Sequence, residues 1–128
     1  MNFEEHTPHN IAYQTGELRF QEQSYTTPQI ITDSGCRPIS ESTPQQLTAA
    51  SFQNIIAATA STGSGQDGNA PEIIIVGTGE KQVFIHPKIV AELAADGIAL
   101  ESMNSAAACR TYLILQSEGR RVWLWLWV

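Results

Sequence analysis

The sequence predicts a single α/β domain in which a mixed β-sheet lies between layers. Its 128 residues match the usual size of one domain. Strand-like runs separated by turn residues fill the first part of the chain. From residue 71 onward, apolar strand patterns alternate with helical patterns, which is typical of a parallel sheet covered by helices.

The N-terminal part predicts a β-hairpin or meander. We expect residues 1–9 to form a disordered tail and residues 10–128 to form the domain. The run NIAYQTGELRF has strand-like residues on both sides of a Gln-Thr-Gly turn signal. A second run, SYTTPQIIT, contains Pro28, which places its first half at a sheet edge or a bulge. Residues 33–42 then predict a loop that carries Cys36.

The next segment predicts one amphipathic helix followed by a loop. Thr43 and Pro44 form an N-cap and first-turn pair, and Gln46 completes a capping-box pattern. Apolar residues at helical spacing continue the pattern to about Ala60. Residues 61–70 are rich in Gly, Ser, Asp and Asn, so we expect a flexible loop.

The C-terminal half predicts alternating strands and helices. The unbroken run Ile73–Val76 is apolar on both faces, as expected for a central strand with helices on both sides. A strand, a helix and a second strand in so few residues imply a parallel crossover unit. The expected elements after this strand are a helix from Pro87 to about Asp96, a strand over 98–102, a helix from Ser105 to about Glu118 and a strand over 121–128.

Composition and charge exclude several classes of function. A net charge of −6 and a single close basic pair, Arg120-Arg121, argue against nucleic-acid binding. The N-terminus lacks a signal-peptide pattern, and the most apolar run, VWLWLWV, is far shorter than the roughly 20 residues of a spanning helix. We therefore expect a cytoplasmic protein without stable membrane insertion. The two cysteines and three scattered histidines predict free thiols, no metal site and no cofactor.

Four short motifs in the C-terminal half occur together in one known family. They are Gly77-Thr78-Gly79 after an apolar strand, Met103 after a later one, the segment Ala108–Tyr112, and Glu118-Gly119-Arg120 before the last strand. With the similar N-terminal part, the chain resembles small α/β proteins related to mitochondrial complex I assembly factor three and to adipogenesis-associated domains. The resemblance covers about residues 10–127.

This resemblance implies a three-layer fold around a mixed five-stranded sheet, with the last strand antiparallel to the others. It also implies an assembly role through protein contacts, and it supplies no catalytic residues. Two positions depart from the family pattern. Asn104-Ser105 replaces Asp-Thr, which keeps a capping group at Ser105, and Leu113 replaces an asparagine, which removes a polar group.

The helix from Ser105 carries the first candidate site. At 100° per residue, one face gathers small and apolar residues that we expect to pack on the sheet: Ala107, Ala108, Thr111, Ile114 and Leu115. Cys109 and Leu113 then lie opposite, with Arg110 beside them, so we expect Cys109 to point away from the sheet. A thiol near Arg110 and the helix N-terminus could serve as a nucleophile. Since no histidine lies nearby in sequence, we favour packing or partner contact over catalysis.

Two further features are ambiguous between structure and binding. Gly77-Thr78-Gly79 lies at the carboxyl end of a strand, where α/β proteins often bind ligands. The residues EKQVFIHP separate it from the next helix, so we favour a tight turn over a phosphate site, although Arg37 and Arg110 could serve an anion. The tryptophans at 123, 125 and 127 share one strand face, and burial on both faces is favoured over an exposed aromatic platform.

Taken together, these patterns predict a non-enzymatic module for protein–protein contact, monomeric or weakly dimeric. The expected binding surface comprises Cys109, Arg110, Leu113, Gly77, Thr78, Gly79 and Trp127. The alternative is a small-molecule or anion-binding protein, or an enzyme that uses Cys109 as nucleophile beside Arg110.

Overall fold

The structure, a computed structural model, describes residues 10–61 and 70–128. The predicted tail over 1–9 and almost all of the predicted flexible loop lie outside these residues. The elements follow in this order: β1 (Ile11–Gln14), β2 (Glu17–Phe20), β3 (Gln23–Tyr25), β4 (Gln29–Thr32), β5 (Gly35–Pro38), the 3₁₀ turn η2 (Pro44–Gln46), α1 (Ala49–Ser61), β6 (Ile73–Thr78), α2 (Pro87–Ala95), β7 (Ala99–Met103), α3 (Ser105–Ser117) and β8 (Val122–Trp127).

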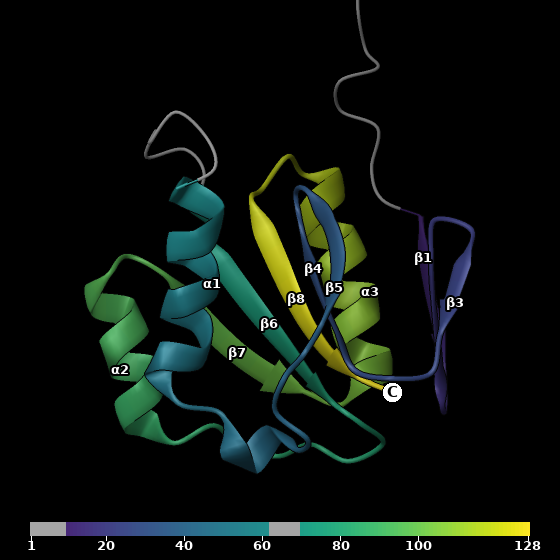
Figure 1. The fold of residues 1–128 in the computed structure, drawn as a ribbon, viewed down its shortest axis with the longest axis horizontal. Coiled ribbons are helices and arrows are strands. Elements are labelled where there is room, and N and C mark those ends of the chain that lie inside the picture. Colours follow the sequence, from purple (N-terminus) through teal and green to yellow (C-terminus); the bar gives the residue numbers. More distant parts are fainter. Residues whose placement is uncertain (1–9, 62–69) are drawn as a thin grey trace, which may run out of the picture.

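The described strands form two sheets. A small antiparallel sheet has the order β1-β2-β3, and a mixed sheet has the order β5-β4-β8-β6-β7 (Figure 1). Strand β6 pairs in parallel with β7 and with β8, which confirms the predicted parallel crossover unit. The predicted fold class, an α/β domain around a five-stranded mixed sheet with an N-terminal hairpin, is therefore confirmed.

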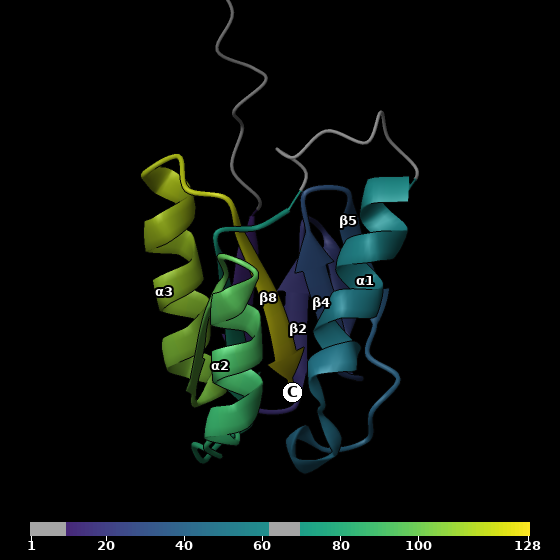
Figure 2. The ribbon, with the colours of Figure 1, turned by 90° about the vertical axis from the view of Figure 1, so that its left-hand side faces the viewer.

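Apolar side chains on the two faces of the large sheet form two separate clusters. The tryptophans of β8 lie in one cluster, together with Phe52 of α1 and Leu93 of α2. Leu124 and Leu126 of β8 lie in the other, with residues of α3 and of the small sheet. Figure 2 shows α1 and α3 on opposite sides of the large sheet. Successive side chains of a strand point to opposite faces of the sheet, so β8 contributes tryptophans to one cluster and leucines to the other.

The last strand lies inside the sheet, between β4 and β6. It is antiparallel to β4 but parallel to β6, with Ile75 and Ile31 both opposite Leu124. The expectation of a last strand antiparallel to the others is therefore wrong for β6. Within the described five-stranded sheet, β4 is antiparallel to both its neighbours, β5 and β8, and it enters this sheet from the N-terminal strands instead of through a crossover helix.

Pro28 separates the two sheets. The run predicted as one extended segment is divided into β3, in the small sheet, and β4, in the large one. Proline lacks the N–H that a continuous ladder would need, so the chain changes sheet at this residue. The predicted loop after Thr32 is wrong for Gly35–Pro38, which returns as edge strand β5 and pairs with β4. Its short polar sequence carried no alternation signal.

Helix α1 begins later than predicted. Thr43 caps only the short turn η2, and its side chain makes no capping bond. The Gln46 side chain instead accepts a hydrogen bond from the backbone N–H of Ser42 at 2.9 Å. Leu47 is extended, and Ala49 starts the α-helix. The capping pattern at Thr43, Pro44 and Gln46 therefore marks the separate turn η2 and not the start of α1.

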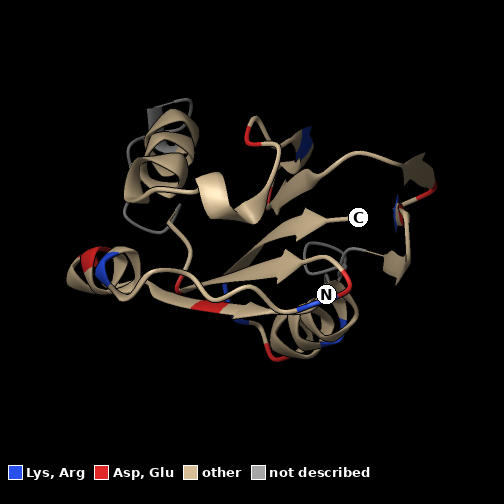
Figure 3. Ribbon diagram, turned by 90° about the horizontal axis from the view of Figure 1, so that it is seen from below, with Lys and Arg blue, Asp and Glu red and all other residues tan. Residues whose placement is uncertain are grey.

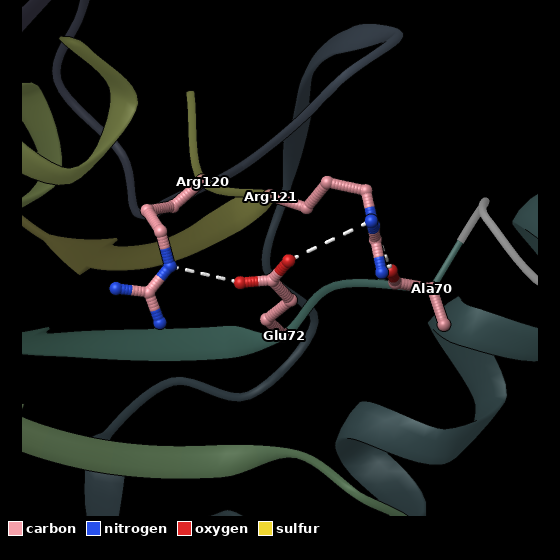
Figure 4. A network of polar contacts seen from close by, with 4 residues as sticks. All are labelled: Ala70, Glu72, Arg120 and Arg121. Atoms are coloured by element: carbon pink, nitrogen blue, oxygen red, sulfur yellow. Dashed lines mark hydrogen bonds and ion pairs between the residues drawn. The ribbon is translucent and has the colours of Figure 1, made fainter. Parts of the chain in front are cut away.

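The basic pair Arg120-Arg121 is used within the fold. Arg120 Nε lies 2.9 Å from one carboxylate oxygen of Glu72, and Arg121 lies 3.6 Å from the other (Figure 4). The hydrogen bond from Arg120 holds the pKa of Glu72 below its usual range. These contacts join the approaches to β6 and β8. Among the other described residues, Lys, Arg, Asp and Glu are distributed over several elements (Figure 3).

In the described part of the chain, no helix combines the length and the apolar character needed to cross a bilayer.

Candidate functional site

Helix α3 is rotated relative to the prediction. Its buried residues are Ser105, Ala108, Cys109 and Tyr112. Ile114, which was expected to face the sheet, is 57% exposed. The prediction is wrong because it assumed a single packing partner for α3. The helix contacts β6 and β8 on one side and β1 on the other, so its buried stripe is turned toward both sheets.

Cys109 lies in the interior, and the expectation that it faces outward is wrong. Its side chain is 5% exposed and belongs to the cluster that contains Leu18 and Phe20 of the small sheet. Burial raises the pKa of the Cys109 thiol, and the neighbouring Arg110 only partly opposes this effect. A buried thiol with a raised pKa is a poor nucleophile. The geometry at Cys109 therefore supports packing beneath the N-terminal strands.

The Cys36 thiol is half-buried on edge strand β5. Its sulfur lies 3.3 Å from Oε1 of Gln29. Gln29 comes two residues before Ile31, the residue of β4 that pairs with Cys36. Burial raises the pKa of Cys36 to about 11. Both described cysteines are free.

The turn Gly77-Thr78-Gly79 has a structural role. A Cβ atom on Gly77 would lie 2.6 Å from Leu126 Cδ1 and 2.9 Å from the Cβ of Ala108, so only glycine lets α3 approach β6 this closely. Thr78 Oγ1 donates to the carbonyl of Lys81 at 2.7 Å and accepts from the N–H of Val83 at 2.9 Å. Gly79 has φ +97°, a conformation that favours glycine.

Ser105 joins three elements at the carboxyl edge of the sheet. Its hydroxyl donates to the carbonyl of Trp127 at 2.6 Å and accepts from the N–H of Gly79 at 2.8 Å. Its own N–H donates to the carbonyl of Gly79 at 2.7 Å. The helix cap predicted at Ser105 is supplied instead by Asn104, whose side chain accepts from Ala107 N at 2.8 Å. The first turn of α3 is thus partly satisfied by the protein itself, which disfavours an anion site there.

The tryptophan row is buried, as favoured from the sequence. Trp123 and Trp125 have no exposed surface, and Trp127 is almost fully covered. The indole N–H of Trp127 donates to the carbonyl of Ser42 at 3.0 Å. Trp127 therefore does not belong to an accessible binding surface, and neither do Cys109, Gly77 or Thr78.

The outward face of α3 includes two residues of the predicted binding surface, Arg110 and Leu113. Arg110 is exposed, Leu113 is half-buried against the core, and Ile114 is exposed one turn beyond Arg110. Ala106 continues this row toward the helix start. We call Ala106, Arg110, Leu113 and Ile114 the α3 patch. Arg110 is the single charged residue of the helix, so this outward face is unusually apolar.

A second exposed apolar site was not predicted from the sequence. Phe84 is 80% exposed, in the irregular segment between β6 and α2. Hollows of about 320 Å³ and 220 Å³ flank it, and Phe84 and Ile85 line both. The signal that could have found it is an aromatic residue in a stretch with neither helical nor strand periodicity, bounded by Gly79 and Pro87. We call residues 79–88 the Phe84 segment.

Metal-ligating side chains do not cluster in the described part of the chain. Within ranges 10–61 and 70–128, no group of three or more His, Cys, Asp or Glu side chains is placed to hold a metal ion. The two arginines proposed for an anion lie on different elements, Arg37 on edge strand β5 and Arg110 on α3. Ser105 therefore connects β6, β8 and α3 through hydrogen bonds. Two exposed apolar surfaces remain as candidate binding sites, the α3 patch and the Phe84 segment.

These features define a small α/β domain whose polar contacts are mainly structural and whose exposed apolar groups lie on one helix and one connecting segment. The chain belongs to the protein family of unknown function DUF498/DUF598, whose model matches residues 11–127. The resemblance to relatives of complex I assembly factor three is thereby confirmed.

Named relatives and solved structures agree with this assignment. A 52-residue region is 44% identical to the 13 kDa major membrane protein of Francisella tularensis, covering 41% of this chain and 42% of that protein. A 49-residue region is 41% identical to mouse NADH dehydrogenase [ubiquinone] 1 alpha subcomplex assembly factor 3, covering 38% of this chain and 26% of that protein. The chain thus matches less than half the length of these relatives. A crystal structure from Bordetella parapertussis is 30% identical, with TM-score 0.78 over 94% of this chain and 95% of that one.

Proposed function

We propose that this domain is a non-enzymatic, assembly-factor-like module that binds a protein partner through the α3 patch. The observation that carries the proposal is the exposure of Ile114, at 57%, on a helix face with a single charge. Solvent-facing helix surfaces ordinarily carry several charged residues, and contiguous exposed apolar groups mark interaction sites. The mouse relative is named as an assembly factor, which supports the same role.

The chemistry of the patch describes its partner. Arg110 makes no ion pair with any described residue, and Ile114 follows it by one helical turn. A complementary surface would therefore place a carboxylate opposite Arg110 and an apolar side chain against Ile114 and Ala106. Arginine beside an apolar anchor is a frequent combination in binding hot spots, because its guanidinium forms paired hydrogen bonds with carboxylates.

The alternative of an enzyme that uses Cys109 lacks support in the site. Its thiol is buried and its pKa is raised, whereas a nucleophilic cysteine needs access and a lowered pKa. The alternative of an anion site at Gly77–Gly79 is disfavoured by the hydrogen bonds that Ser105 makes to this turn.

Affinity capture with matched variants tests the proposal. The wild type, Ile114→Asp and Ala95→Asp are tagged and expressed in the organism from which the chain comes, and captured proteins are quantified. Ala95 is an exposed residue of α2, so its change to aspartate controls for added charge. We expect at least one protein to be captured equally by the wild type and Ala95→Asp, and about tenfold less by Ile114→Asp.

A direct measurement then confirms the contact. The captured protein, once purified, should bind the wild type and should lose affinity for Ile114→Asp and Arg110→Glu, with unchanged thermal unfolding of both variants. Capture that is the same with all three proteins would contradict the proposal. Leu113→Asp is a poorer probe, because Leu113 packs partly against the core and its change should also lower stability.

A further inference from the structure

We infer that the α3 patch also pairs with a second copy of this chain, in a symmetric dimer whose two α3 helices pack antiparallel about a two-fold axis at Ile114. This inference rests on the proposed function, because it uses the same helix face, and it names one particular partner for that face. Its basis is the order of three exposed side chains along the helix: Arg110, Ile114 and Glu118.

Ile114 lies at the centre of the outward face of α3. At 100° per residue, it stands opposite the buried stripe of the helix, with Arg110 one turn before it. Glu118 stands one turn after it, because the N–H of Glu118 donates to the carbonyl of Ile114 at 3.2 Å and so continues the helical path. Figure 2 shows α3 along one side of the molecule, with no other labelled element outside it. The three side chains therefore form one outward row.

The two charges of this row are not neutralised within the described chain. Neither Arg110 nor Glu118 makes an ion pair with a described residue. They are about 12 Å apart along the axis, beyond the three- and four-residue spacings at which side chains of one helix meet. The nearby Arg120 is engaged by Glu72 at 2.9 Å. Of the main strand neighbours of α3, β1, β6 and β8 carry no charged residue, and β7 carries Glu101, which makes no ion pair with Arg110.

A cation, an apolar group and an anion at equal spacing form a row that is its own complement. When a second α3 runs antiparallel with Ile114 opposite Ile114, each Arg110 faces the Glu118 of the other copy, so both ion pairs form together. Thr111 then faces Ser117 of the other copy. Both are small, and the Ser117 hydroxyl already donates to the carbonyl of Ile114 at 2.7 Å. Charge complementarity thus favours a second copy of the chain as the occupant of this face.

The dimer should be weak and reversible. A 13-residue helix is about 20 Å long, so one helix pair should bury less than the roughly 800 Å² per partner of a standard interface. The net charge of −6 on each copy adds long-range repulsion. Because the dimer and a protein partner use the same face, each contact should exclude the other.

Sedimentation equilibrium of the untagged full chain tests the pairing, from about 10 µM to about 1 mM protein, the range of weak association. We expect the wild type to dimerise reversibly. Arg110→Glu and Glu118→Arg should each lower the association constant about tenfold, because either change places like charges opposite each other at two symmetric positions. The double variant R110E/E118R, and an equimolar mixture of the two single variants, should recover association to within about threefold of the wild type, because opposite charges face each other again.

Charge changes elsewhere serve as matched controls. Glu92→Arg on α2 and Arg37→Glu on β5 alter exposed charges, and Glu101→Gln removes the other carboxylate near α3. None of these should weaken dimerisation by more than about twofold, and every variant should keep the thermal unfolding of the wild type. A wild type that stays monomeric over the whole range would overturn the inference. So would a double variant and a mixture that associate no better than the single variants.

Partner capture separates this inference from the proposed function. R110E/E118R should keep self-association and lose the captured protein, whose complementary carboxylate would be repelled. Loss of a captured protein with Ile114→Asp, together with a monomeric wild type, would leave the proposed function standing and exclude the dimer. Dimerisation with charge-swap rescue, but with no captured protein that depends on Ile114, would establish the dimer and contradict the proposed function.

Discussion

Strand β8 and the Phe84 segment both contain aromatic residues, yet these residues lie in opposite environments. The three tryptophans of β8 are covered, whereas Phe84 is largely exposed. Strand β8 has a neighbour on each edge and apolar clusters on each face. The Phe84 segment pairs with no strand and is held mainly by side-chain hydrogen bonds.

This difference shows how a place between two layers buries the aromatic rings of β8, whereas a connecting segment without strand pairing leaves that of Phe84 exposed. The interior even accommodates two indole N–H groups, of Trp123 and Trp125, that have no hydrogen-bond partner in the described structure. Leaving such a group unsatisfied costs about 1–3 kcal/mol. Packing of these rings therefore outweighs a substantial polar penalty.

The largest expected effect is at Trp125. Its ring lies 4.8 Å from that of Phe52 and 6.5 Å from that of Trp123, measured between ring centroids. Trp125→Ala should lower the free energy of unfolding by about 3–5 kcal/mol, because it leaves a cavity in the α1-facing core. Urea unfolding followed by far-UV circular dichroism measures this loss. A change below about 1 kcal/mol would mean that β8 is not the centre of the core.

Ser105 connects the two regions, so its removal should affect both. Ser105→Ala deletes the bonds to Trp127 of β8 and to Gly79 at the start of the Phe84 segment, and leaves the N–H of Gly79 without its acceptor. We expect a loss of about 1–3 kcal/mol in the free energy of unfolding.

Amide hydrogen exchange gives a second measure of the same change. Exchange should become faster at Gly79 and Val83 and stay unchanged in the β1–β2 hairpin, which is distant in sequence and makes no bond to Ser105. Uniformly faster exchange would instead indicate general destabilisation.

The fold was largely predictable because its signals are periodic. The unbroken run in β6, the alternation in β8 and the helical spacing after Pro87 each fix an element from local sequence alone. The errors arose where tertiary context decides. Strand β5 has no apolar alternation, and η2 has the capping residues of a helix but ends after one turn.

The candidate site was less predictable, for a specific physical reason. The orientation of α3 depends on how the small β1-β2-β3 sheet packs against it, and helical periodicity contains no information on a second partner. Tyr112 was missed as a core residue, and Ile114 was placed inside. Phe84 was missed because exposure in an irregular segment depends on long-range contacts such as that between Gln82 and Ser102.

Cys36, half-buried on edge strand β5 beside β4, should make the stability of the fold depend on pH. The folded-state pKa of Cys36, about 11, exceeds its unfolded value near 8.5. Its contribution to stability is therefore complete below pH of about 8.5 and is lost as the pH rises through 11. The free energy of unfolding should decrease over this range, and less steeply in Cys36→Ser. Equal slopes for both proteins would exclude Cys36 as a source.

The smallest expected effect is at Phe84. Phe84→Ser should change the free energy of unfolding by less than about 0.5 kcal/mol, because the ring contributes little to the core. The same urea measurement serves as the counterpart of Trp125→Ala. A loss above about 2 kcal/mol would show that the ring is buried in solution and would remove the contrast between the two regions.

The central position of β8 also has a consequence for the order of folding. Strands β4 and β6 are neighbours only through β8, so residues far apart in the chain remain unpaired until the last strand of the domain has been synthesised. Until then the nascent polypeptide exposes two strand edges and the apolar side chains that will line them, which is the state most prone to aggregation. We therefore expect a version truncated before Val122 to be less soluble than the full domain.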